Sequence, residues 1–180
     1  MIPVYFLSIF IMVSIYFHAF SFYFPYIFRS LSDSFLTDHF LADNILLDEA
    51  GRVKLADFGA SSTLSADETL ANEFKGVKGT VAYMCPEMIR GGSYGRKCDI
   101  WSLGTIVIEM VTGKRPWSHL VDSNYFAVLY HIGSTEAPHP LPDDTPPLAV
   151  DFIHKSMDRV PQQRPSAEDL LLHNFLLPES

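Results

Sequence analysis

Cysteine and basic residues are both scarce in this sequence of 180 residues. Its two cysteines, Cys85 and Cys98, do not have the spacing of metal ligands, and the sequence contains no second pair of cysteines. Neither a zinc site nor a disulfide framework is therefore indicated, and a reducing compartment fits best. Lys and Arg number 13 against 21 Asp and Glu, which gives a net charge of −8. We expect no nucleic-acid partner, because binding to phosphates needs clustered basic residues.

The first 41 residues lack glycine, lysine and glutamate altogether. Nine of the 14 Phe lie there, and Arg29 is the first charged residue of the chain. Hydropathy alone predicts a membrane helix over residues 2–28, since a run of this length can span the roughly 30 Å hydrocarbon core of a bilayer. The run has neither the basic start nor the small-residue cleavage site of a standard secretory signal peptide. Translated non-coding sequence is the alternative interpretation, because Phe, Ser, Ile, Tyr and Leu have T-rich codons, and the sequence does not separate the two.

The composition changes near Ala42, and residues 42–177 read like an ordinary soluble domain. Short apolar runs at residues 45–47 and 53–55 flank turn-forming residues, which predicts a β-hairpin. Small and polar residues from Ala60 to Gly79 predict a long mobile loop.

The rest of this part is predicted to be helical. A stretch that is apolar nearly all round follows Asp99 and ends at Gly113, so we expect a buried helix capped by Asp99. Ser166 and Asp169 have the pattern of a capping box ahead of a final helix. Further helices are expected at residues 124–132, 147–157 and 170–175. The predicted fold class is α+β, mainly α, with one small β-hairpin.

Five short motifs follow one another in residues 42–177. They are Asn44-Ile45-Leu46-Leu47, Asp57-Phe58-Gly59, Gly79-Thr80-Val81-Ala82-Tyr83-Met84-Cys85-Pro86-Glu87, Asp99-Ile100-Trp101-Ser102-Leu103-Gly104 and Arg164-Pro165. In this order and spacing they resemble the C-terminal helical lobe of a serine/threonine protein kinase. The sequence of residues 106–117 is similar to that of the MAP kinase kinase kinases, especially the MEK-kinase branch.

The resemblance implies ATP and Mg²⁺ as cofactors. Asn44 matches the catalytic-loop asparagine and Asp57 the aspartate of the Asp-Phe-Gly motif, and in kinases these two residues hold the Mg²⁺ ions. Phe58 and Gly59 complete the cofactor-binding motif. A turn residue and a hairpin end are the plain alternatives for Asn44 and Asp57, but their separation of 13 residues favours the kinase interpretation.

Four further residues have roles that the resemblance implies. Thr80 matches the threonine that bonds the catalytic Asp and Lys beneath the substrate site. Glu87 and Arg164 match a buried ion pair that anchors the activation segment, and Asp99 matches a scaffold residue at the start of the central helix. Cys85 stands where alanine is usual, and a buried spectator role is expected for it.

Thr69 and Thr80 are possible phosphorylation sites, because a phosphate could order the loop by pairing with Lys or Arg. A solvated loop rich in small residues is the alternative for each position.

The resemblance breaks ahead of Asn44. The residues Thr37-Asp38-His39-Phe40-Leu41 stand where the catalytic base and its lysine partner belong, and Asp38 is one residue out of register. A shift of one residue moves a side chain by more than about 3 Å. No Gly-rich loop, strand lysine or partner glutamate precedes this window. We expect the N-terminal, ATP-cradling lobe to be missing and this chain to be inactive alone.

The sequence therefore predicts a fragment of a MAP kinase kinase kinase-like enzyme, whose parent phosphorylates a protein substrate of the MAP kinase kinase type. A pseudokinase or docking module is the alternative, acting through the helices after Gly104. The resemblance implies a cytoplasmic location, and residues 2–28 leave membrane association open.

Overall fold

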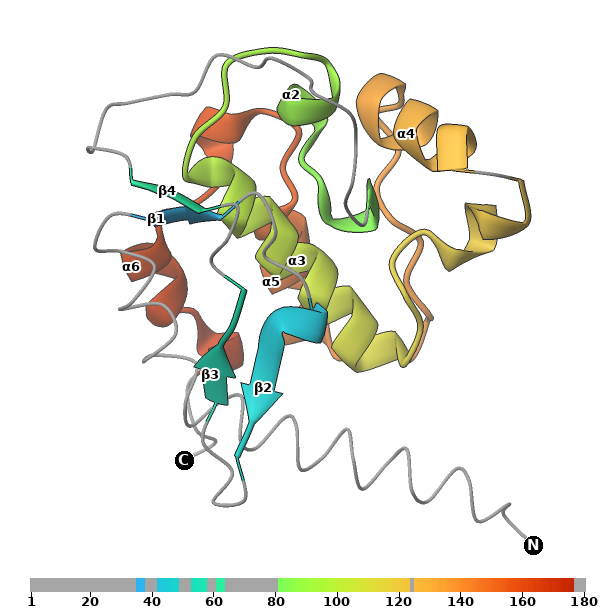
Figure 1. Ribbon diagram of the computed structural model, residues 1–180. Coiled ribbons are helices and arrows are strands. Elements are labelled where there is room, and N and C mark those ends of the chain that lie inside the picture. The colour runs from blue at the N-terminus through green and yellow to red at the C-terminus, as the bar shows by residue number, and fades with distance from the viewer. Residues whose placement is uncertain are drawn as a thin grey trace, which may run out of the picture.

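One long helix, α3 (Lys97–Thr112), forms the centre of the molecule (Figure 1). The structure is a computed structural model, which describes residues 35–37, 42–48, 53–57, 61–63, 81–123 and 125–176. The helix is buried from Cys98 to Ile108, as its apolar sequence predicts. It ends where predicted, with Gly113 in the left-handed region at φ 64°. It begins earlier than predicted, because Arg96 holds the N-cap position and Asp99 lies inside the first turn.

The other helices pack around α3. The second core helix, α5 (Pro147–Ser156), lies against α3. Gly104 permits this close approach, because a Cβ there would lie 2.6 Å from Met157 Cγ and 3.0 Å from Ser156 Cβ. The remaining helices are α2 (Pro86–Ile89), α4 (Tyr125–Ser134) and α6 (Ala167–Leu171), with 3-10 turns η1 (Ala42–Asn44), η3 (Val81–Tyr83), η4 (Ser118–Ser123), η5 (Pro161–Gln163) and η6 (Asn174–Leu176).

The predicted capping box at Ser166 is confirmed. The Ser166 hydroxyl accepts from the Asp169 backbone N–H, while the Asp169 side chain accepts from the Ser166 backbone N–H. The helix that follows is shorter than expected, because α6 ends at Leu171 and Asn174–Leu176 form a separate 3-10 turn. The mainly helical fold class is also confirmed.

Two hydrophobic clusters share α3 between them. One lies between α3, α5 and the C-terminal turns, and includes Ile106, Phe152 and Phe175. The other lies between α2, α3 and α4, and includes Trp101 and Trp117. Each cluster thus joins segments that are far apart in the sequence to one helix, so that α3 fixes their relative positions.

Two small antiparallel sheets accompany the helices. The predicted hairpin is confirmed, since β2 (Ile45–Leu47) pairs with β3 (Val53–Leu55) and Ile45 lies opposite Leu55. The second sheet, β1 (Phe35–Thr37) with β4 (Ser61–Thr63), was not predicted. It joins a segment placed ahead of the kinase-like part to the start of the expected loop. The two strands are far apart in the sequence and pair through backbone groups, so no local sequence pattern predicts their pairing.

Cys85 and Cys98 form a disulfide bond, so the expectation of a chain without disulfides is wrong. The start of α2 packs on the first turn of α3, which brings the two Cα atoms to 5.3 Å, within the usual range for a bridge. Cys85 is buried as expected, but it is bonded rather than a spectator. Sequence spacing carried no sign of this tertiary contact.

Several predictions fall on residues outside the described ranges. They concern residues 2–28 as a membrane helix, the motif residues Phe58, Gly59 and Thr80, and the phosphorylation candidate Thr69. Within the described ranges, no helix has both the length and the apolar character needed to cross a bilayer.

Candidate functional site

The two expected metal-ligand positions lie side by side at one end of the β2–β3 hairpin. The Ala56 backbone N–H donates to the Asn44 carbonyl at 2.9 Å, one step beyond the Ile45–Leu55 pair. This bond places Asp57 next to the chain at Asn44. Asn44 is half-buried, whereas Asp57 is exposed. The hairpin therefore brings an asparagine and an aspartate from separate segments to the same edge.

Asp57 has an unusual backbone conformation. Its φ of 59° lies in the left-handed region, which aspartate enters more readily than most residues but which still costs free energy. Such conformations concentrate at functional sites, where the surrounding structure holds them. The exposed Asp57 carboxylate and the Asn44 side-chain oxygen are hard oxygen donors, the ligand type that suits Mg²⁺. The residues present thus fit a magnesium site.

Glu87 and Arg164 meet in a bidentate ion pair. Arg164 Nη1 lies 2.7 Å from Glu87 Oε1, and Nη2 lies 2.8 Å from Oε2. The Arg164 side chain is 0% exposed and that of Glu87 14% exposed. Two parallel hydrogen bonds fix direction as well as distance. The pair ties the start of α2 to the segment between η5 and α6, which lies 77 residues further along the chain.

Arg164 also contacts the first turn of α3. Its guanidinium donates to the carbonyls of Lys97 at 2.7 Å and Asp158 at 2.8 Å, and lies 5.1 Å from the Trp101 ring centre. In return the Lys97 ammonium donates to the Arg164 carbonyl. Burial lowers the pKa of Lys97, and the nearby Arg164 charge lowers it further, against the opposing effect of Asp169. Arg164 is thus the residue through which α2, α3 and the C-terminal segment are joined.

Asp99 lies in this same first turn of α3. Its side chain is buried, with 5% of the residue exposed. A carboxylate so placed needs hydrogen-bond partners, and the position at a helix N-terminus favours its negative charge.

Sequence reasoning missed the side chains that hold residues 81–85, the stretch directly after Thr80. The Tyr83 hydroxyl donates to Glu109 Oε2 on α3, and Ser102 Oγ donates to the Tyr83 carbonyl at 2.9 Å. Burial raises the pKa of Tyr83, and its hydrogen bond to the Glu109 carboxylate raises it further. A buried tyrosine needs a hydrogen-bond partner for its hydroxyl, so the tyrosine in this motif could have predicted that such a partner lies nearby.

Trp117 fixes the same stretch from the loop after α3. Its indole Nε1–H donates to the Ala82 carbonyl at 3.0 Å, and its backbone N–H donates to His139 Nε2 at 3.0 Å. Trp117 is fully buried with φ at 61°, a conformation that is strained for a bulky residue. The backbone of the loop is thus strained at Trp117, the residue that holds residues 81–85.

The geometry agrees with two comparisons with known proteins. The sequence model of the protein kinase domain family matches residues 41–176. Mitogen-activated protein kinase kinase kinase 3 of Arabidopsis thaliana is 45% identical over 133 residues, which are 74% of this chain and 20% of that protein.

Two other relatives are similar at nearly the same level. Mitogen-activated protein kinase kinase kinase A of Dictyostelium discoideum is 40% identical over 134 residues, 74% of this chain and 14% of that protein. Mitogen-activated protein kinase kinase kinase 1 of Homo sapiens is 40% identical over 132 residues, 72% of this chain and 9% of that protein. The chain therefore spans a fifth or less of the length of these relatives, and the resemblance predicted from the five motifs is confirmed.

Proposed function

Because this chain belongs to the protein kinase family, we propose that it supplies the helical lobe of a MAP kinase kinase kinase-like serine/threonine kinase. The parent enzyme transfers the γ-phosphate of ATP to Ser or Thr of a protein substrate of the MAP kinase kinase type. One observation carries the proposal. The 2.9 Å bond between Ala56 and Asn44 sets Asn44 beside Asp57, the two positions that hold Mg²⁺ in kinases.

The proposed roles divide between two sets of side chains. Asn44 and Asp57 hold Mg²⁺, which when bound neutralises charge on the phosphates. Glu87 and Arg164 act at a distance from the reaction and keep the end of the activation segment in position. Tyr83 and Trp117 hold the stretch after Thr80, which in our proposal positions the substrate beneath the phosphate.

The chain as it stands is proposed not to transfer phosphate. A catalytic base must approach the substrate hydroxyl to about 3.2 Å. In the window 37–41 the base and its lysine partner are absent, and Asp38 stands one residue out of register. Residues 1–41 are proposed as a non-kinase segment and 42–177 as a partial kinase domain.

A docking module without catalysis is the second candidate, and the surface of α4 favours it. Phe126 is 73% exposed and Tyr130 70% exposed, with Tyr125 beside them at 42%. Aromatic side chains presented together on a helix are typical of protein interfaces. In this version the lobe binds a protein partner through α4, in the cytoplasm or, with residues 2–28 as an anchor, at a membrane.

A chimera separates the two candidates. Residues 1–41 are replaced by the corresponding part of the Arabidopsis thaliana relative, which restores an ATP-binding lobe and a catalytic loop ahead of Ala42. We expect the original chain to show no phosphorylation of a MAP kinase kinase substrate, and the chimera to phosphorylate it in the presence of Mg-ATP. Asp57→Asn in the chimera should reduce kcat by about 10²-fold or more, because it removes charge at the metal site.

Asp43→Asn is the matched control, since it makes the same change on an exposed carboxylate next to Asn44. It should leave kcat of the chimera within about twofold, as expected for an exposed ion pair with Arg115. A chimera that folds and binds Mg-ATP but does not phosphorylate substrate would contradict the kinase proposal and favour the docking module.

A further inference from the structure

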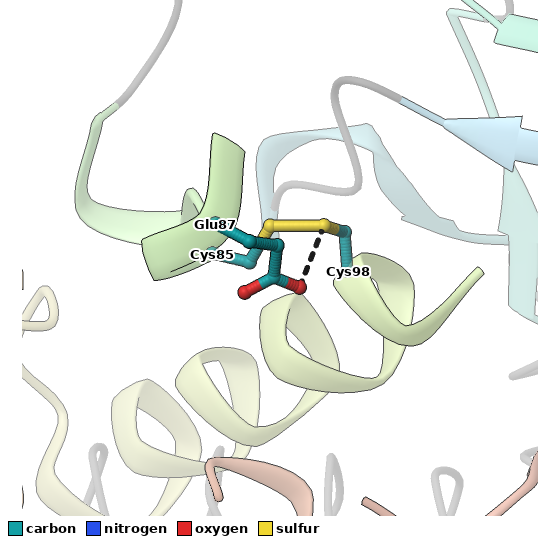
Figure 2. Close-up of side chains that lie close together, drawn as sticks. All are labelled: Cys85, Glu87 and Cys98. Carbon is teal, nitrogen blue, oxygen red and sulfur yellow. Dashed lines mark hydrogen bonds between the residues drawn. A yellow bond between two sulfur atoms is a disulfide. The ribbon is translucent and has the colours of Figure 1, made fainter. Parts of the chain in front are cut away.

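The disulfide between Cys85 and Cys98 lies at the point where the activation segment ends. Cys85 directly precedes α2, and Cys98 is in the first turn of α3 (Figure 2). The two residues are 1% and 3% exposed. The Glu87 carboxylate lies beside the bridge, with Oε1 at 3.2 Å from Cys98 Sγ. The bond thus sits directly against the Glu87–Arg164 ion pair.

A metal site is the first alternative for this cluster. The two sulfur atoms and a Glu87 oxygen all lie within 4.8 Å of one another, close enough to share a cation. Both Glu87 oxygens, however, already accept hydrogen bonds from the Arg164 guanidinium. A cation at this place would face that positive charge, and the sulfur atoms are bonded to each other. The arrangement favours redox chemistry over metal binding.

We propose that Cys85 and Cys98 form a reversible redox site that locks the end of the activation segment to α3. The reactants are thiols and disulfides. In oxidation, the two protein thiols attack a disulfide R–S–S–R in turn, through a mixed disulfide, and give the protein disulfide and two R–SH. The protein loses two electrons and two protons, and the reagent gains them. A reducing dithiol reverses the step.

The scaffold around the site holds both ends in place without the bond. Arg164 binds Glu87, two residues after Cys85, and the carbonyl of Lys97, which directly precedes Cys98. Cleaving the disulfide leaves these hydrogen bonds intact. The two sulfur atoms therefore stay close in the reduced chain, which favours closure again.

Glu87 provides for the reduced state as well. With the bond cleaved, the Cys98 thiol can donate to the Glu87 oxygen that lies 3.2 Å away. The buried Cys98 thiol then has a partner, so reduction does not leave its hydrogen unsatisfied. Both redox states are thus accommodated by one set of neighbours, as a reversible site requires.

The test measures the redox state of the full chain in glutathione buffers. Free thiols are alkylated at each ratio of reduced to oxidised glutathione, and the 85–98 linked peptide is quantified by mass spectrometry. We expect the linked peptide to form and disappear reversibly across these buffers, within single chains. The reduced chain should melt about 5–10 °C lower, because the bridge closes a loop between residues 13 positions apart in the sequence.

Cys85→Ala is the control variant, since it removes one sulfur atom and substitutes a small residue. It should lose the linked peptide and the redox-dependent shift in melting temperature together. Three results would overturn the proposal, and the wild-type chain alone can give each of them. They are a peptide that never forms, a bond that persists under reducing buffer until the chain unfolds, and a bond that joins two chains.

Discussion

The two groups of kinase-like residues lie near different ends of α3, and their surroundings are built differently. At its start, Glu87 and Arg164 are enclosed between α2, α3 and the C-terminal segment. Near its end, the β2–β3 hairpin presents Asp57 to solvent from strands of three residues each. The hairpin reaches the loop after α3 through an ion pair of 3.2 Å between Arg115 and Asp43.

This difference bears on which of the proposed functions lie within the helical lobe. The Glu87–Arg164 pair, which in our proposal anchors the activation segment, is formed by residues of the helical body. The hairpin edge with Asn44 and Asp57, proposed to hold Mg²⁺ and called the metal-ligand edge below, has backbone pairing on one side and an exposed Asp57. In our proposal that open side is where the ATP-binding lobe of a kinase completes the site.

The largest effect is expected for Arg164→Ala, which removes the residue that joins three segments. Glu87 would then be a charge left without its partner in a largely buried place. Breaking one side of a buried pair typically costs about 3–5 kcal/mol in the free energy of unfolding. Urea unfolding followed by circular dichroism measures this difference, and thermal melting does so where the variant is too unstable.

The double variant Glu87→Ala with Arg164→Ala separates the ion pair from simple loss of packing. Because no charge is stranded, it should be less destabilised than the sum of the two single variants. Additive effects would mean that Arg164 stabilises the chain through its contacts with Lys97 and Trp101 alone, and that its ion pair with Glu87 does not anchor α2.

Much of this anchor could be predicted from the sequence. The motifs identified Glu87 and Arg164 although they are 77 residues apart, because the pair recurs in the family that the motifs resemble. Local patterns also indicated α3, the β2–β3 hairpin and the capping box at Ser166, each of which depends on residues close in sequence.

The remainder depends on contacts between distant segments. No local pattern indicates that Cys85 meets Cys98, or that β1 pairs with β4 through backbone groups. Trp117 belongs to the family-like stretch 106–117, yet its bond to Ala82 exists only because the loop after α3 folds back with a positive φ. Such contacts follow from tertiary packing, which a single sequence does not encode by period or spacing.

A smaller effect, dependent on pH, is expected from His139, which supports Trp117 in the helical body. Burial, with a further contribution from His119 and His131, lowers the pKa of His139 to about 4, and a backbone interaction with Pro140 opposes the shift. The folded chain thus keeps this ring neutral and able to accept from the Trp117 N–H, whereas the unfolded chain protonates it near pH 6.5. The contribution of neutral His139 to the free energy of unfolding is therefore fully present above pH 6.5 and falls as the pH drops towards 4.

The variant His139→Gln removes this titration and retains an acceptor. Between pH 7 and pH 5, the wild-type chain should lose about 1–2 kcal/mol of unfolding free energy relative to the variant, after allowance for partial solvent screening. His154→Gln, on the exposed side of α5, is the matched control and should leave the pH dependence unchanged. Equal pH dependence in wild type and His139→Gln would show that the loop holding Ala82 does not depend on a neutral His139.

The smallest effect is expected where the hairpin meets the loop after α3. Arg115 and Asp43 are 59% and 71% exposed, so water and salt screen their attraction, and Arg115→Ala should change the free energy of unfolding by about 0.5 kcal/mol or less. Hydrogen exchange should nevertheless speed up at the β2 amides, since the hydrogen bond from Arg115 to Asp43, which links this hairpin edge to the loop, would be gone. Unchanged exchange would mean that backbone pairing and the packing of Ile45 on the core position the metal-ligand edge. A large loss of global stability would instead make this edge part of the helical body, and would remove the difference between the two ends of α3.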